Sequence, residues 1–193
     1  MKWIIIRHGT TKGNTERRFS GITDDPLIDE GIRELIEKKS GGLYSETEQA
    51  LENGAGLYVS PMKRCTATAE ILFPGRSYSI EKDLHEIDFG EFEGKNHAEL
   101  NGLEAYQEWI DLRGKAPFPG GESREEYILR IRGALRRLED EALKEGKDTV
   151  VIVAHGGTIM SAREILAGGD FYDEIPENGG VFTAETKTEI SSM

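Results

Sequence analysis

Only one cysteine, Cys65, occurs among the 193 residues of this chain. A single thiol excludes an intrachain disulfide and any metal site built from several cysteines. Long apolar runs are also missing: Trp3 to Ile6 and Val150 to Ala154 are far shorter than the ~20 residues of a membrane-spanning helix. Arg7 and His8 interrupt the first run, which leaves no apolar core for a signal peptide there. We therefore expect a cytoplasmic protein that does not span a membrane.

Basic residues are scarce: 24 Lys and Arg stand against 36 Asp and Glu, for a formal net charge of −12. This balance excludes a general affinity for nucleic acid or for an anionic membrane surface. A small anionic ligand stays open, provided that its site concentrates positive charge. Hydrophobic residues make up 37% of the chain and charged residues 31%, which indicates a globular protein and not a disordered tail. Without an internal repeat or a linker, residues 1–193 are predicted to form one domain.

Five segments have the composition of β-strands. Residues 2–6 (KWIII) and 149–154 (TVVIVA) are nearly continuous, β-branched apolar runs, which are typical of strands covered on both faces. LYVS at 57–60, SYSI at 77–80 and VFTAE at 181–185 are shorter candidates. We expect the first two segments to be the central strands of a sheet.

Helical segments alternate with these strands. The clearest one runs from Ser123 to about Lys144 and opens on SREE, a capping box in which Glu126 stands at the third helical position. Its apolar residues recur at spacings of three and four: Ile128, Ile131, Leu135, Leu138 and Ala142. Shorter helices are predicted at 29–38, 61–73, 103–112 and 157–167. This alternation predicts an α/β fold, a three-layer α/β/α sandwich around a mostly parallel, doubly wound sheet.

Charged and polar side chains stand where the predicted strands end. The first strand ends in Arg7 and His8, and the strand at 149–154 ends before His155. Ligands of open α/β sheets collect beyond the carboxyl ends of the strands, so the two imidazoles are expected to face each other. After the third strand, Ser60 can cap a helix that carries Arg64 one turn in. The free N–H groups of that helix start and the two arginines predict a site for phosphate.

Five segments of the chain resemble, in order and spacing, the motifs of the histidine phosphatase superfamily, the phosphoglycerate mutase-like proteins. They are RHGTTKGNTERRFSGITDDPLIDEG at 7–31, SPMKRCTATAEIL at 60–72, HEIDFGEFEGK at 85–95, PGGES at 119–123 and VIVAHGG at 151–157. The resemblance covers nearly the whole chain and implies the phosphoglycerate mutase-like fold. Within this superfamily, the chain is similar to the short phosphatase branch that includes α-ribazole phosphatases. One departure is Thr10, where the family often has glutamate, and it bears on fine substrate preference.

The resemblance also implies roles for the site residues. His8 would attack phosphorus and form a phosphohistidine, while Glu86 would protonate the leaving alcohol and later activate water. Arg7 and Arg64 carry planar guanidinium groups that match pairs of phosphate oxygens. His155 would donate to an equatorial oxygen of the transition state. The remaining contacts to the substrate phosphate that the resemblance implies are Asn14, Ser20, Gly21 and Gly156.

Neither a metal nor a cofactor is implied. Two histidines and Glu86 could in principle bind zinc, but the neighbouring arginines would oppose a dication. Cys65 is expected to belong to the core, and His85 and His97 lack a place at a strand end. Arg18 is expected to pair with acidic neighbours. Four aromatic residues are candidates for stacking on a ring of the substrate: Trp3, Tyr106, Trp109 and Phe118. Aromatic residues more often belong to the core.

Three functions remain open at this point. A phosphomonoester hydrolase is favoured, because the stretch between Gly94 and Ser123 is short for the insertion that, by the resemblance, shields the phosphoenzyme of mutases from water. A mutase would return the phosphoryl group to a sugar acid, and a non-catalytic protein would only bind a phosphorylated ligand. The expected partner is a small phosphorylated metabolite: α-ribazole phosphate, phosphoserine, a sugar phosphate or several of these. The sequence does not choose between a monomer and a homodimer.

Overall fold

The computed structural model describes residues 1–169, 171, 175–186 and 190. Its central sheet has the order β3-β2-β4-β1-β5. The strands are β1 (Lys2–Arg7), β2 (Gly56–Val59), β3 (Ser79–Ile80), β4 (Thr149–Ala154) and β5 (Val181–Glu185). β1 pairs in parallel with β4, as β4 does with β2 and β2 with β3, and only the pairing of β1 with β5 is antiparallel. The predicted, mostly parallel α/β sheet is confirmed.

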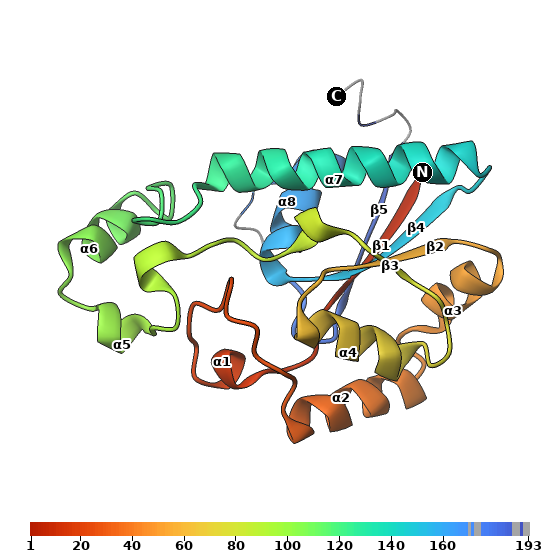
Figure 1. Cartoon of the computed structure of the whole chain (residues 1–193), viewed down its shortest axis with the longest axis horizontal. Coiled ribbons are helices and arrows are strands. Elements are labelled where there is room, and N and C mark those ends of the chain that lie inside the picture. The colour runs from red at the N-terminus through yellow and green to blue at the C-terminus, as the bar shows by residue number, and fades with distance from the viewer. Residues whose placement is uncertain (170, 172–174, 187–189, 191–193) are drawn as a thin grey trace.

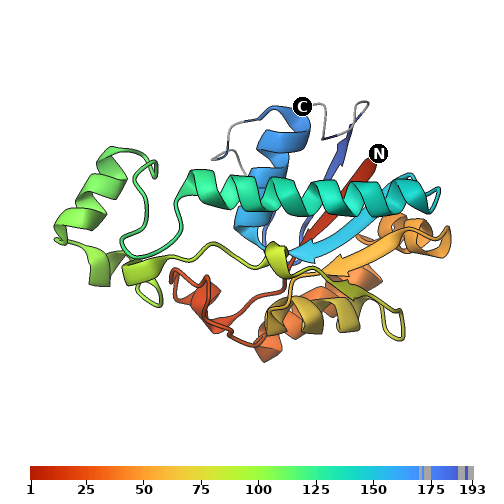
Figure 2. The same ribbon diagram turned by 45° about the horizontal axis from the view of Figure 1, so that its top comes forward.

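The helices cover both faces of this sheet, as Figures 1 and 2 show. They are α1 (Lys12–Thr15), α2 (Asp29–Ser40), α3 (Ser45–Glu52), α4 (Lys63–Leu72), α5 (His97–Leu100), α6 (Glu104–Asp111), α7 (Arg124–Lys144) and α8 (Gly156–Ala167), with 3-10 turns η1 (Lys82–Leu84) and η2 (Gly90–Phe92). α7 and α8 pack on one side, and α2, α3 and α4 on the other. Among the described residues, no helix is long and apolar enough to span a membrane.

β1 is buried on both faces, because its residues alternate between two cores. Trp3 and Ile5 join the core under α7 and α8, whereas Ile4 and Ile6 join the core under α2, α3 and α4. All four side chains are at most 1% exposed. Each buried isoleucine stabilises the fold by roughly 1.5–3 kcal/mol relative to an exposed one. This packing fixes the register of β1 and so the position of Arg7 at its end.

α7 follows the predicted pattern closely. The side chain of Ser123 accepts a hydrogen bond from the backbone of Glu126, whose carboxylate accepts from the Ser123 N–H, so the capping box is present. Ile128, at the start of the apolar stripe, is half-buried. The other members of the stripe are buried: Ile131, Leu135, Leu138 and Ala142. α7 therefore spans the face of the sheet and carries its first turn toward the site.

One predicted strand is shorter than expected, one predicted helix begins slightly later, and one helix was not predicted. The strand predicted at 77–80 is reduced to β3, two exposed residues at the sheet edge. The helix predicted from residue 61 begins at Lys63 as α4. α3 was not predicted, because its sequence SETEQALE buries only Thr47 and Leu51 and so has almost no apolar period. The extent of the domain over 1–193 stays a prediction.

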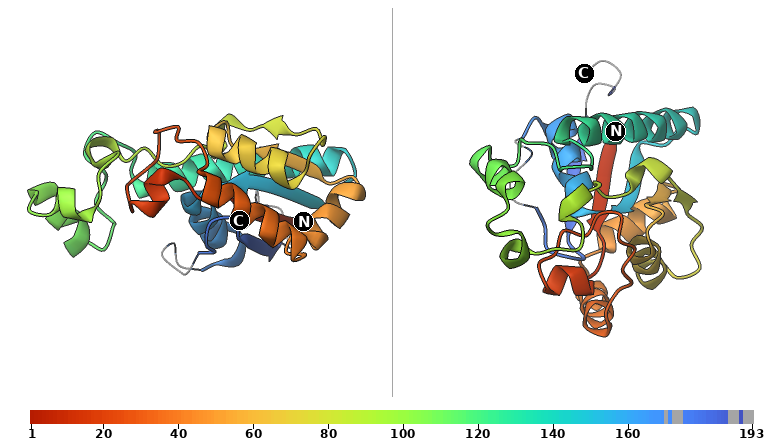
Figure 3. Two further views of the ribbon diagram at one scale, coloured as in Figure 1. Left: turned by 90° about the horizontal axis from the view of Figure 1, so that it is seen from below. Right: turned by 60° about the vertical axis from the view of Figure 1, so that its left-hand side comes forward.

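α5 and α6 lie beyond the end of the sheet and project from the body of the molecule (Figures 1 and 3). Phe92 and Tyr106 are buried there, and Trp109 packs against them. The chain then returns through the PGGES turn to the first turn of α7. This projecting segment forms one wall at the carboxyl ends of β1 and β4.

Candidate active site

A pocket of about 270 Å³ opens at the carboxyl ends of β1 and β4. Arg7 and His8 reach it from the end of β1, and Gly156 from the start of α8. Glu86 comes from the segment after η1. The structure thus brings together residues from three distant parts of the chain. The strand-end argument predicts two of these parts, and the family resemblance implies the third, which carries Glu86.

His8 is held as one tautomer of a neutral imidazole. Its Nδ1 lies 2.7 Å from the carbonyl oxygen of Gly9, and because a carbonyl only accepts, Nδ1 carries the proton. Burial and then the positive charges of Arg64 and Arg7 lower the pKa of His8 to about 3. At neutral pH its Nε2 therefore has a free lone pair, which is the form that a nucleophile requires.

His155 and Arg64 form a buried pair behind His8. The rings of His8 and His155 meet edge to face with centroids 5.3 Å apart. Arg64 Nε donates to Nδ1 of His155 at 3.2 Å, so the other nitrogen, Nε2, carries the proton and donates to Ser60 Oγ at 2.7 Å. Burial and the charge of Arg64 lower the pKa of His155 well below its usual value. Both nitrogens of His155 are thus occupied by protein groups, and its predicted bond to a phosphate oxygen stays a prediction.

Arg64 also differs from the expected arrangement. Its remaining nitrogens donate to three backbone carbonyls, those of Ser20, Gly21 and Thr23. The side chain is 1% exposed. Arg64 therefore supplies a buried positive charge next to both histidines, and its direct contact with phosphate stays a prediction.

Ser60 does not cap α4, contrary to the sequence-based expectation. The N-cap of α4 is Met62, without a side-chain hydrogen bond. The Ser60 hydroxyl is engaged by His155, and the backbone N–H of Met62 reaches it only at 3.5 Å. The serine thus orients the second histidine instead of starting a helix.

Arg7 keeps donor capacity at the pocket. Its Nη1 donates to the carbonyl of Pro176 at 3.0 Å. Its Nε is buried and has no hydrogen-bond partner among the described residues. An unpaired buried donor costs about 1–3 kcal/mol, and a phosphate oxygen is the kind of acceptor that would satisfy it.

Three hydrogen bonds hold the Glu86 carboxylate. Oε1 accepts from the hydroxyl of Tyr127 at 2.8 Å and from the N–H of Ile87 at 3.0 Å, while Oε2 accepts from the N–H of Gly157 at 3.2 Å. Tyr127 is fully buried and also bonds to Thr158. Burial and the charge of Glu86 raise the pKa of Tyr127 well above its usual value, so its hydroxyl stays a donor. Sequence reasoning missed Tyr127, because within α7 it looks like one more core residue.

The segment that carries Glu86 is tied to α7 by Arg130. The guanidinium donates to the carbonyls of Asp83 and His85, at 2.7 and 3.0 Å, and pairs with Glu122 of the PGGES turn at 2.6 Å. It also lies 4.7 Å from the centre of the Tyr127 ring. These bonds fix the backbone on which the candidate acid stands.

Of the other predicted phosphate contacts, two line the pocket and one does not. Asn14 and Ser20 line the pocket, and the amide oxygen of Asn14 accepts from Thr11, which leaves its NH2 as the donor end. Gly21 is not among the lining residues: its N–H donates to Glu93, and a Cβ there would lie 1.8 Å from the carbonyl of Ile87. The glycine is thus required for close backbone packing, and its predicted contact with the substrate phosphate stays a prediction.

Several expectations about neighbouring residues are confirmed. Cys65 is buried, and burial raises the pKa of its thiol to about 12. Arg18 pairs with Glu16 and Glu99, both at 2.6 Å. Trp3 and Phe118 are core residues, and Phe118 also lines the pocket together with the half-buried Trp109. Phe19 and Phe89, which sequence reasoning did not single out, line it as well.

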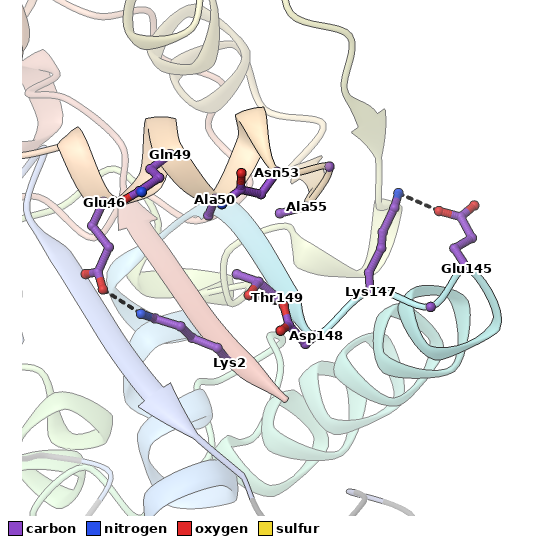
Figure 4. Close-up of a pocket in the computed structure, with 12 residues that line it drawn as sticks. Lys2, Glu46, Gln49, Ala50, Asn53, Ala55, Glu145, Lys147, Asp148 and Thr149 are labelled. Atoms are coloured by element: carbon purple, nitrogen blue, oxygen red, sulfur yellow. Dashed lines mark hydrogen bonds and ion pairs between the residues drawn. The ribbon is translucent and has the colours of Figure 1, made fainter.

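A larger cavity of about 640 Å³ lies at the opposite end of the sheet, where β1 and β4 begin. Figure 4 shows its polar lining, with Lys2 paired to Glu46 and Lys147 paired to Glu145. The described residues that line it include neither histidine nor arginine. Size alone therefore misplaces the site, and the chemistry of the side chains favours the smaller pocket. Within the described part of the chain, no cluster of three or more His, Cys, Asp or Glu residues is arranged to hold a metal.

Comparison with known proteins identifies relatives of this chain. Phosphoglycerate mutase-like protein 4 of Arabidopsis thaliana is 32% identical over 167 residues, which cover 83% of this chain and 69% of that protein. Phosphoserine phosphatase 1 of Hydrogenobacter thermophilus is 30% identical over 88% of this chain and 78% of that protein. The structure of α-ribazole phosphatase from Shigella flexneri shares the fold, with a TM-score of 0.75 at 22% identity over 95% of this chain and 89% of that chain.

The family itself follows from the sequence profile that matches most of the chain. Residues 3–173 match the Histidine phosphatase superfamily (branch 1). The match includes the five motif segments and therefore both histidines, Arg64 and Glu86. This chain belongs to branch 1 of the histidine phosphatase superfamily.

Proposed function

We propose that the protein hydrolyses phosphomonoesters through a covalent phosphohistidine at His8. The observation that carries this proposal is the state of His8: a buried, neutral imidazole with Nδ1 bound to Gly9, beside the cationic groups of Arg7 and Arg64. A phosphate monoester is an anion, so an uncharged nucleophile in a cationic setting is suited to attack it. Family membership supports the same reaction.

The geometry supports two successive displacements. In the first, Nε2 of His8 forms a bond to phosphorus while the bond from phosphorus to the alcohol oxygen breaks, and protonated Glu86 gives its proton to that oxygen. In the second, a water molecule attacks phosphorus, the bond between nitrogen and phosphorus breaks, and Glu86 takes the proton from water. Arg7 supplies positive charge to the phosphoryl oxygens, and Arg64 supplies it from behind the two histidines.

We expect the substrate to be a small phosphorylated metabolite. The pocket, at about 270 Å³, is at the small end of typical ligand sites. Relatives at 30–32% identity are named as a phosphoserine phosphatase and a phosphoglycerate mutase-like protein. A cytoplasmic location and the oligomeric state, monomer or homodimer, stay predictions from the sequence.

The direct test is release of inorganic phosphate from p-nitrophenyl phosphate in the presence of a chelator. Wild-type protein should turn over, and His8→Ala should not. A matched control is His97→Gln, because His97 bonds to Tyr106 and is not among the pocket-lining residues. Quenching the reaction early should trap protein-bound phosphate that is stable in base and labile in acid, as phosphohistidine is.

The same assay separates the alternatives. Turnover that depends on priming with a bisphosphate ester would favour a mutase, and relatives of that class exist at 31% identity. Binding of phosphate esters without release would favour a binding protein. Full activity in His8→Ala would refute the covalent mechanism.

A further inference from the structure

The wall of the pocket away from the histidines is aromatic. Five aromatic side chains are among the described lining residues. Four of them form one cluster, those of Phe19, Phe89, Trp109 and Phe118, and the fifth, Phe171, lies against the guanidinium of Arg124. Phe89 packs edge to face against Phe19 and Phe118, with centroid distances of 5.1 and 5.0 Å, and Trp109 lies tilted against Phe118. Rings fixed by one another keep their positions before a ligand arrives, so the wall is preformed.

The charged side chains on the same wall already have partners. Arg18 forms ion pairs of 2.6 Å with both Glu16 and Glu99 and donates to the carbonyl of Gly94. Arg124 pairs with Glu164 at 2.7 Å. Among the described lining residues the remaining cation is Arg7, which belongs to the phosphate end. A carboxylate on the leaving group would therefore gain a cationic partner on this wall only by displacing an existing ion pair.

The size of the pocket limits what can bind beside the phosphate. An apolar cavity of roughly 150 Å³ accepts a benzene molecule. The pocket of about 270 Å³ thus holds a phosphate and one ring system. Larger groups would have to extend into solvent.

We propose that this aromatic wall binds an uncharged, ring-bearing leaving group, and that the protein prefers such phosphate esters to esters with a carboxylate. The inference rests on the proposed function, because it concerns the alcohol part of the substrate that His8 attacks. It separates this chain from relatives named for phosphoserine or phosphoglycerate, whose leaving groups carry a carboxylate.

The test compares three esters of primary alcohols, so that intrinsic reactivity stays similar: ethyl phosphate, 2-phenylethyl phosphate and O-phosphoserine. The ring should raise kcat/KM at least about tenfold over ethyl phosphate, in line with the discrimination that hydrophobic pockets achieve. O-Phosphoserine should not exceed ethyl phosphate. Equal values for the two uncharged esters, or a preference for O-phosphoserine, would overturn the inference.

Substitution of a wall residue links the preference to this surface. Phe89→Leu keeps an apolar side chain but removes the ring, and it should lower the ratio of kcat/KM between 2-phenylethyl and ethyl phosphate by roughly three- to tenfold. The matched control is Phe182→Leu in β5, a half-buried phenylalanine outside the pocket, which should keep the wild-type ratio. A ratio that is the same in both variants would contradict the proposal.

A binding measurement separates failure of this inference from failure of the proposed function. 2-Phenylethylphosphonate and ethylphosphonate cannot be cleaved at the bond to carbon, and their Kd values can be measured by calorimetry. If no ester is hydrolysed but the ring-bearing phosphonate binds at least about tenfold more tightly, the subsite stands and the proposed function falls. If esters are hydrolysed but the two phosphonates bind equally, the subsite falls alone.

Discussion

Gly157→Ala is the sharpest perturbation of the candidate acid, because it adds one methyl group next to Glu86. A Cβ at residue 157 would lie 2.3 Å from Oε1 of Glu86 and 3.0 Å from the ring of Tyr127. Real Cβ atoms essentially never lie within 3.0 Å of a non-bonded heavy atom, so the carboxylate must move by about 0.7 Å or more. Tyr127 is fully buried and bonds to the same oxygen, which restricts where the carboxylate can go.

The expected effect is large for esters that need a protonated leaving group. A misplacement of 1 Å at a reacting group costs roughly 10²-fold in rate, so kcat/KM for ethyl phosphate should fall by about that factor. p-Nitrophenyl phosphate should lose much less, because its phenolate leaves without help from an acid. Steady-state assays with the two esters measure this difference directly.

The matched control is Gly133→Ala in the middle of α7, where an added Cβ would meet only the end of Arg137, at 3.5 Å. Replacing a glycine inside a helix stabilises it by roughly 0.5–1 kcal/mol, so this variant should melt at a slightly higher temperature with unchanged kinetics. Retention of wild-type kcat/KM for ethyl phosphate in Gly157→Ala would show that Glu86 is not the acid. Equal losses on both esters would show general damage to the site.

Two further predictions concern the same network. Folded His8 stays neutral down to about pH 3, and burial also lowers the pKa of His155. In the unfolded chain both imidazoles take up a proton below about pH 6.5, so acidification favours the unfolded state. We expect His8 alone to lower the free energy of unfolding by about 2 kcal/mol between pH 7 and pH 5. Urea denaturation at both values checks this, and an identical pH dependence in His8→Asn would contradict it. Tyr127→Phe removes one donor from Glu86 and should lower kcat/KM for ethyl phosphate roughly 10-fold or more, with a smaller loss on p-nitrophenyl phosphate; equal losses would indicate a structural role alone.

The main elements of the fold could be predicted because the apolar patterns were unambiguous. KWIII and TVVIVA are strands buried on both faces, and the capping box at Ser123 starts α7 where the sequence places it. α3 escaped prediction because a surface helix with two buried residues leaves little trace in the sequence. The short β3 is an edge strand whose residues are exposed, so its extent depends on its neighbour.

The site shows where sequence reasoning reaches its limit. Placing Arg7, His8 and Gly156 at one edge of the sheet required only the strand ends and their parallel order. The partner of each polar group could not be predicted in the same way. Ser60 has the sequence context of a helix cap, yet its hydroxyl bonds to His155.

The sequence by itself determined which chemical groups are present and which strands deliver them, because local propensity and burial patterns act over neighbouring residues. Tertiary structure alone decided how those groups are used. Arg64 is surrounded by the carbonyls of Ser20, Gly21 and Thr23, and Glu86 is held by a tyrosine 41 residues away. Such contacts depend on distances between segments remote in the chain, and hydrogen bonds form only where folding brings donor and acceptor within about 3 Å.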